Sequence, residues 1–161
     1  MILMPELVPE PLWGLSAYRL LGRGAKWKQI RSETLRAAGN RCSVCGEVRA
    51  ALSCHEKWLY DDSTGTVTLS GFAVNCRECD LATHIGRAIQ HGFADEAIEQ
   101  LCRINNCSRK QADTMIDNAL NKWRKRSSQS WMIVVDAALL RRYPALEVLH
   151  GKRGDAEPGV K

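Results

Sequence analysis

Two Cys-x-x-Cys pairs, Cys42 with Cys45 and Cys76 with Cys79, constrain this chain more than any other feature. Two intervening residues let both thiolates of a pair reach one ion, and zinc prefers four tetrahedral ligands of this kind in a structural site. The chain has seven cysteines, an odd number that argues against a disulfide framework. The spacing therefore predicts one structural Zn²⁺ held by all four residues. The competing interpretation, a redox pair, is typical of a single Cys-x-x-Cys and needs no second one.

The segments around these cysteines suggest how the pairs meet. Residues 26–38 have helical apolar spacing and end at a Gly-Asn stop. Residues 50–59 and 66–74 are two strand candidates separated by the turn sequence DDSTG, which predicts a β-hairpin. A helix is expected to begin at the second cysteine pair and to run to about Gln90. A zinc knuckle, a hairpin and a helix in this order follow the treble-clef plan.

Downstream of this module the sequence predicts two more helices and a strand. Helical spacing covers residues 95–104 and 108–125, and Ser108 with Gln111 matches a capping box. Residues 131–135 (WMIVV) are a short strand candidate, and Asp136 is expected to cap a last helix that ends before Pro144. The expected class is therefore α+β and mostly helical, with additional helices flanking the zinc module.

Composition and charge restrict the location and the partners. Of 161 residues, 45% are hydrophobic and no apolar run is long enough to span a bilayer. The proline-broken N-terminal stretch lacks the features of a secretory signal, so a cytoplasmic protein without a membrane partner is expected. The net charge of +5 favours a polyanionic partner such as nucleic acid, although solvated helix faces also explain the basic clusters.

A second group of residues could hold a catalytic ion beside the zinc. Asp80 and His84 are four residues apart on the predicted helix and therefore share one face. If that face meets the hairpin, His55 joins them, so that Asp80 offers oxygen, His84 offers nitrogen and His55 activates water. The alternative is that His55 is a packing or surface residue paired with a neighbouring charge.

The order of the segments CSVCG, CHEKWLYDD and CRECDLATHIGRA resembles the zinc-bearing HNH endonuclease family. The likeness continues through GFADEAIEQLCRIN to WRKRSSQSWMI, so it covers about residues 26–140. It implies a ββα-metal core that cleaves nucleic acid phosphodiesters, with DNA favoured over RNA. It also implies that His55 is the general base and that a divalent ion, Mg²⁺ or a transition metal, binds at position 80.

The sequence departs from the family pattern at that position. Members usually have histidine directly after the last cysteine, whereas this chain has Asp80, and Asn75 is the nearest candidate for the asparagine of the family's name. Two hypotheses follow. In an active nuclease, Lys57, Arg77 and Arg87 face phosphates. In a catalytically degenerate module, the protein binds nucleic acid or serves as a structural subunit of a larger complex.

The expected domain organisation has three parts. Residues 1–15 form an extended, proline-punctuated arm, residues 16–145 form a single HNH-like zinc domain with a helical C-terminal extension, and residues 146–161 form a flexible tail. The arm or the C-terminal helices could bind a protein partner. The simpler interpretation is that they complete the small core of the zinc module.

Overall fold

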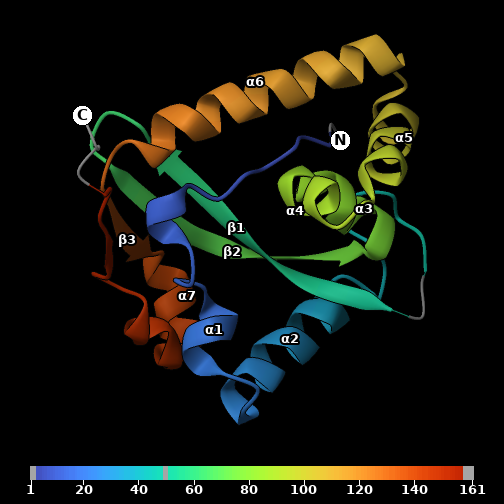
Figure 1. Cartoon of the computed structure of the whole chain (residues 1–161). Helices are drawn as coiled ribbons and strands as arrows, with labels where there is room; N and C mark the ends of the chain where they lie inside the picture. The colour runs from blue at the N-terminus through green and yellow to red at the C-terminus, as the bar shows by residue number, and fades with distance from the viewer. Residues whose placement is uncertain (1–2, 49–50, 158–161) are drawn as a thin grey trace. The chain divides into compact units, whose positions relative to one another are not determined.

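The computed structural model describes residues 3–48 and 51–157, and it confirms the α+β class (Figure 1). One sheet has the strand order β1-β2-β3-β4. The chain divides into two compact units, a division that the prediction of a single domain over residues 16–145 did not include. Unit 1 comprises Met1–Leu7, Leu35–His55 and Val74–Trp123, and unit 2 comprises Val8–Thr34, Glu56–Ala73 and Arg124–Lys161.

Most of the elements lie close to predicted positions, and several short ones were not predicted. The strands are β1 (Leu52–Asp61), β2 (Thr66–Cys76), β3 (Trp131–Val135) and β4 (Arg153–Gly154). The α-helices are α1 (Ala17–Leu21), α2 (Ala25–Ala37), α3 (Arg77–Thr83), α4 (Ile85–Gln90), α5 (Ala94–Asn105), α6 (Arg109–Ser127) and α7 (Ala137–Arg142). Two 3₁₀ helices are η1 (Glu10–Leu12) and η2 (Pro144–Val148). Within the described residues, no helix has the length and apolar character needed to cross a membrane.

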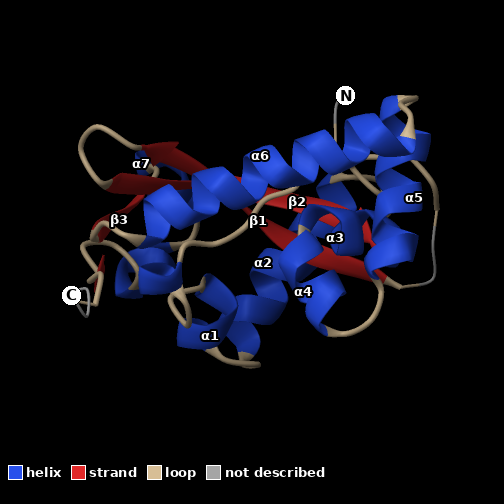
Figure 2. Ribbon diagram, turned by 45° about the horizontal axis from the view of Figure 1, so that its top comes forward, coloured by secondary structure: helices blue, strands red, loops and turns tan. Residues whose placement is uncertain are grey.

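The predicted hairpin is confirmed, with strands two residues longer at their C-terminal ends than expected. In Figure 2 the long strands β1 and β2 run side by side, as the sheet order requires. The Asp61 carboxylate accepts hydrogen bonds from the backbone N–H groups of Ser63 and Thr64, which fixes the connecting turn. Gly65 closes it at φ +67°, where a Cβ atom would lie 2.8 Å from the Ser130 carbonyl oxygen.

The helix boundaries follow the predicted capping chemistry. Helix α2 ends at Gly39 and Asn40, both at positive φ, and the Asn40 N–H donates to the Leu35 carbonyl. The Ser108–Gln111 box opens α6, since each residue's side chain accepts a hydrogen bond from the other's backbone N–H. The Asp136 carboxylate accepts from two N–H groups in the first turn of α7. These three predictions are confirmed.

Unit 1 is organised around α3, α4, α5 and the first part of α6. Helix α5 contacts both α3 and α4. One apolar cluster joins these helices to the N-terminal segment, and its buried members are Leu3, Leu81, Ala82, Ile85, Ala88, Ala97, Ile98, Leu101, Ala112 and Ile116. Burial of these side chains is the main apolar contribution to the stability of the unit. The predicted continuous helix to Gln90 is wrong, because the chain breaks at His84 (φ −95°, ψ +54°) between α3 and α4.

Unit 2 contains the rest of the sheet. Residues 66–69 of β2 pair in parallel with β3, and β3 pairs antiparallel with β4. Both α1 and α7 contact η2. The flexible tail predicted from residue 146 is wrong for its described part, because Leu146 and Leu149 are fully buried and β4 follows. The predicted extended arm is also interrupted, since η1 forms within residues 1–15. The last residues of the predicted tail, 158–161, lie outside the described part of the chain.

Candidate functional site

The four cysteines of the two pairs come together in unit 1. Cys42 and Cys45 lie in the knuckle after α2, Cys76 ends β2 and Cys79 lies in the first turn of α3. Their sulfur atoms all lie within 4.8 Å of one another. The Cys45 and Cys76 sulfurs are 3.8 Å apart. A tetrahedral ion with Zn–S bonds of about 2.3 Å separates its sulfurs by about 3.8 Å, so this pair already has the spacing that zinc requires.

Local hydrogen bonds hold the knuckle in place. The Ser43 N–H donates to the Val74 carbonyl at 2.6 Å, and the Ser43 hydroxyl accepts from the Val74 N–H at 3.0 Å. Gly46 adopts φ +73°, which lets the backbone turn directly after the second cysteine. The knuckle is thereby fixed to the end of the strand that delivers Cys76.

The protonation of the thiols also favours a cation. Burial raises the pKa of Cys42, but three backbone N–H groups outweigh burial and lower that pKa to about 7. Burial raises the pKa of Cys76 to about 12 and that of Cys79 further. Four thiolates this close repel one another, so full ionisation needs a positive charge among them. The donor set therefore fits zinc, and metal binding at this cluster is plausible on its chemistry.

A buried glutamine supports the cluster from outside. The Gln100 amide on α5 donates a hydrogen bond to the Cys79 sulfur at 3.0 Å, and Gln100 is 5% exposed. Hydrogen bonds of this kind orient metal ligands and stabilise their charge. The sequence prediction missed Gln100, although a polar residue on the apolar face of the helix predicted over residues 95–104 was a usable signal.

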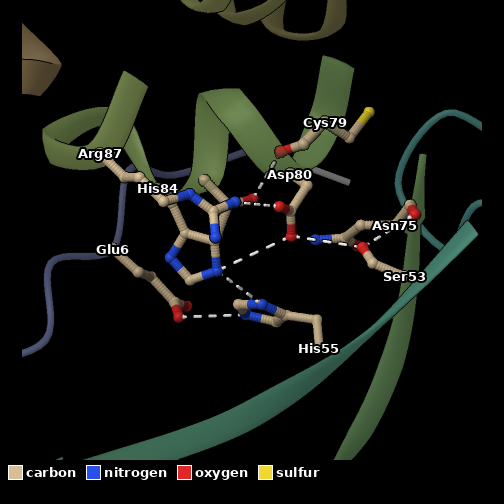
Figure 3. Close-up of polar contacts among 9 residues, drawn as sticks. Glu6, Ser53, His55, Asn75, Cys79, Asp80, His84 and Arg87 are labelled. Carbon is tan, nitrogen blue, oxygen red and sulfur yellow. Dashed lines mark hydrogen bonds and ion pairs between the residues drawn. The ribbon is translucent and has the colours of Figure 1, made fainter. Parts of the chain in front are cut away.

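The second predicted group also converges in unit 1. Ligand atoms of His55, Asp80 and His84 all lie within 4.8 Å of one another. His55 Nδ1 lies 3.1 Å from His84 Nε2, and His84 Nε2 lies 3.7 Å from Asp80 Oδ1 (Figure 3). Ligands about 2.1 Å from one ion lie roughly 3.0–3.4 Å apart in octahedral or tetrahedral geometry. The three side chains therefore fit a divalent cation after small adjustments at Asp80.

Two elements of unit 1 present these residues. His55 is the fourth residue of β1. Asp80 lies in α3 and His84 at the junction of α3 and α4, one helical turn apart, so the predicted shared face is confirmed. The break at His84 directs the following chain away after that turn. His91 is exposed at the end of α4.

Glu6 adds a fourth polar group that the sequence did not indicate. Its carboxylate lies 3.6 Å from His55 Nε2. The N-terminal segment is fixed to the unit, because the Glu6 N–H donates to the Thr83 carbonyl and the Asn105 side chain bonds both backbone groups of Leu3. The acidic oxygen next to Nε2 favours the tautomer with the proton on Nε2 and the lone pair on Nδ1. Nothing in the local sequence around residue 6 signals this contact.

The contact between the two imidazoles requires a hydrogen atom or a cation between the facing nitrogens. With the His55 Nδ1 lone pair facing His84 Nε2 at 3.1 Å, either a proton on His84 or a cation must lie between the nitrogens. Burial lowers the pKa of His84 to about 4, so this ring is neutral at pH 7 and donates one N–H there. A neutral imidazole is also the form that binds metal ions.

Asp80 is held from both sides. Its Oδ2 accepts a hydrogen bond from Arg87 on α4, and its Oδ1 lies 3.4 Å from the Ser53 hydroxyl on β1. Ser53 also donates to the Asn75 carbonyl, and the buried Asn75 side chain points toward Asp80 (Figure 3). Arg87 therefore occupies one carboxylate oxygen with a positive charge. The sequence prediction missed Ser53, whose role depends on the pairing of β1 with β2.

Of the three residues predicted to face phosphates, Arg77 and Arg87 lie in unit 1 and Lys57 lies in unit 2. Arg77 forms an ion pair with Glu96 at 2.7 Å and lies over the Phe93 ring. Arg87 contacts Asp80, as described above. Lys57 is exposed on the part of β1 that belongs to unit 2. Only Arg87 of these three lies against the His55–Asp80–His84 cluster within unit 1.

Comparisons with known protein families, curated proteins and solved structures found no match to this chain. The chemistry of the two clusters therefore rests on their own residues and geometry.

Proposed function

We propose that this protein is an HNH-type, metal-dependent nuclease that hydrolyses DNA phosphodiesters, built on a treble-clef zinc module with a ββα-metal core. One observation carries the proposal: His55 and Asp80, 25 positions apart in the chain, meet His84 with all three ligand atoms within 4.8 Å. The cysteine cluster supports this arrangement, because Cys79 directly precedes Asp80 and anchors the same turn of α3.

The residues have separate roles in this proposal. Asp80 and His84 would hold a divalent cation, Mg²⁺ or a transition metal, which when bound neutralises phosphate charge and favours attack by water. His55 Nδ1 accepts a proton from the attacking water as the general base. Glu6 keeps the other proton of His55 on Nε2 and stabilises the imidazolium that forms. Ser53 orients the Asp80 carboxylate through Oδ1.

A plasmid-cleavage assay tests the proposal. The zinc-loaded protein should nick or cut DNA when Mg²⁺ or Mn²⁺ is added, and His55→Ala should lower the rate by about 10²-fold or more, as expected for loss of a general base. The matched control is His91→Ala, which removes an exposed histidine of the same unit and should leave the rate unchanged. Zinc content should be equal in all three proteins. Intact DNA and RNA with every common divalent ion would rule out the nuclease.

Glu6 provides a second, smaller test of the same site. Glu6→Gln removes the charge that fixes the His55 tautomer, and the cleavage rate should fall roughly tenfold, the lower range for loss of such a supporting contact. Glu10→Gln is the control, because Glu10 is an exposed acid of the same N-terminal stretch and belongs to unit 2. Equal rates for both variants would remove Glu6 from the mechanism.

The alternative function is a non-catalytic zinc module that binds nucleic acid or serves as a subunit of a larger complex. The ion pair between Arg87 and Asp80 favours it, because a guanidinium already neutralises the carboxylate that the ion would need. In that case nucleic acid binding survives His55→Ala but is lost with the zinc. Binding that does not weaken with salt would argue against the nucleic-acid version.

A further inference from the structure

Unit 2 contains a pocket of about 430 Å³. It lies between the first turns of α2 and the residues that join α7 to η2. The residues that line it are Lys26, Gln29, Ile30, Arg142, Tyr143, Pro144 and Ala145. The volume is within the range of sites that take a small organic ligand, roughly 300–1,000 Å³.

Two cations line the pocket, and both have donors to spare. Within residues 3–48 and 51–157, the Lys26 ammonium has no ion-pair partner, and Lys26 is exposed. The Arg142 guanidinium uses Nε and Nη2 to bond one oxygen of Glu33. Its third nitrogen, Nη1, has no hydrogen-bond partner in the described part of the chain. An anion in the pocket could therefore be bound by Lys26 and Arg142 together.

Glu33 holds this arrangement in place. Its carboxylate accepts hydrogen bonds from Gln29 at 3.0 Å and from the Tyr143 hydroxyl at 2.8 Å, besides Arg142 at 3.1 Å. These bonds, that of Gln29 first, lower the pKa of Glu33, so it stays ionised and keeps Arg142 fixed. The guanidinium is thus oriented before a ligand arrives, which reduces the entropic cost of binding. With Glu33 counted, the pocket keeps a net positive charge.

Besides the two cations, and besides Gln29 and Tyr143, which bond Glu33, the rest of the lining is apolar. Ile30 is 1% exposed and forms the inner part of the lining, and Pro144 and Ala145 start η2 beside it. A cationic side next to an apolar side suits a ligand that is a phosphate ester at one end and a flat or apolar group at the other. Free inorganic phosphate would use only half of such a site.

The charge distribution of the chain points to the same unit. Unit 2 has 14 basic and nine acidic residues, whereas unit 1 has nine of each. The whole net charge of +5 therefore resides in unit 2, and unit 1, which contains both metal-site candidates, is neutral overall. Anions are attracted to the positively charged region of a protein before they bind specifically.

We infer that the pocket between α2 and η2 binds a nucleoside phosphate, with Lys26 and Arg142 on the phosphate and Ile30, Pro144 and Ala145 against the nucleoside. The ligand is either a free nucleotide or one nucleotide unit of a nucleic acid chain, since both present the same chemistry. The inference does not depend on the nuclease proposal, because none of these residues belongs to the His55–Asp80–His84 cluster.

Calorimetric titration of the zinc-loaded 161-residue chain tests this site. The probes are adenosine monophosphate, adenosine, inorganic phosphate and a short DNA oligonucleotide, without added divalent ions so that cleavage cannot interfere. Lys26→Gln is compared with Lys28→Gln, which removes an equal charge from the same helix outside the pocket lining. Both lysines are exposed, so both variants should fold, and circular dichroism checks this.

The expected result is that the monophosphate binds more tightly than adenosine or phosphate, and that Lys26→Gln weakens it about tenfold while Lys28→Gln changes it less than twofold. If only the oligonucleotide distinguishes the two variants, the inference also holds and the ligand is a nucleic acid chain. The inference would be overturned if both variants weakened binding equally, or if no nucleoside phosphate, free or in the oligonucleotide, bound to the protein.

Discussion

The cysteine cluster and the His55–Asp80–His84 cluster both draw residues from α3, yet they offer an ion different surroundings. Three of the four cysteines are buried, and their four sulfurs could fill the shell of one tetrahedral ion. The second cluster supplies three nitrogen and oxygen ligands, and its members are half-buried. Closed shells are typical of structural zinc, whereas open positions are typical of catalytic sites. Cys79 and Asp80, adjacent residues of α3, therefore belong to two clusters with different ligand chemistry.

The side chains that support the two clusters also differ, because a neutral group contacts the first cluster and charged groups contact the second. At the cysteine cluster, the neutral amide of Gln100 donates a hydrogen bond to the Cys79 sulfur. At the second cluster, Arg87 pairs with Asp80 and Glu6 lies beside His55. A cation that binds there must displace or tolerate Arg87, so its affinity is expected to be modest and exchangeable. The comparison predicts a permanent ion at the first cluster and a reversible one at the second.

Removal of a zinc ligand should have the largest effect. Cys76→Ser should abolish zinc binding and unfold unit 1, because the free energy of zinc binding, on the order of 10 kcal/mol or more, contributes directly to folding. Atomic emission measures the loss of zinc, and near-ultraviolet circular dichroism measures the loss of tertiary structure. Cys54→Ser is the control, since Cys54 lies in β1 outside the cluster and should keep both signals. A Cys76→Ser protein that retains zinc and tertiary structure would contradict the closed shell.

The second largest effect concerns pH. Burial lowers the pKa of His84 from 6.5 to about 4 in the folded protein, so between these values the unfolded chain binds a proton that the folded chain does not. Stability from this residue is therefore retained above pH 6.5 and lost as the pH falls toward 4. From pH 7 to pH 5 the loss is about 2 kcal/mol.

Comparison with His84→Gln isolates this contribution from acid release of zinc. The difference in unfolding free energy between wild type and the variant, measured in urea at each pH without added divalent ions, should fall as the pH is lowered. A difference that stays constant from pH 7 to pH 5 would show that His84 is not buried as a neutral imidazole.

The smallest effect should come from Arg87. Arg87→Gln removes a positive charge from Asp80, so Mn²⁺ affinity should rise about fivefold, the value of an exposed ion pair of about 1 kcal/mol. Isothermal titration calorimetry measures the Mn²⁺ affinity. Arg77→Gln is the control, because Arg77 pairs with Glu96 and not with Asp80. Weaker Mn²⁺ binding by Arg87→Gln would mean that Arg87 positions Asp80 rather than competing with the ion.

Short-range rules account for the parts of this protein that the sequence predicted well. The Cys-x-x-Cys spacing, the shared face of Asp80 and His84 and the Ser108–Gln111 box each depend on residues a few positions apart. The contacts that the sequence did not predict join segments that are far apart in the chain. Glu6 reaches His55 only because Asn105 fixes the N-terminal segment, and β4 forms only because β3 offers an edge. The local spacing of residues does not indicate such long-range pairings. The break at His84 likewise depends on how α4 packs.

We propose that the second cluster binds a divalent cation separately from the cysteine cluster. Electron paramagnetic resonance of Mn²⁺ added to zinc-loaded protein tests it directly, because bound Mn²⁺ loses its free-ion spectrum and shows coupling to histidine nitrogen. We predict one Mn²⁺ per chain with nitrogen coupling, absent in an Asp80→Ala protein whose zinc content is unchanged. Free Mn²⁺ in the wild-type sample, or binding that Asp80→Ala leaves intact, would contradict the account.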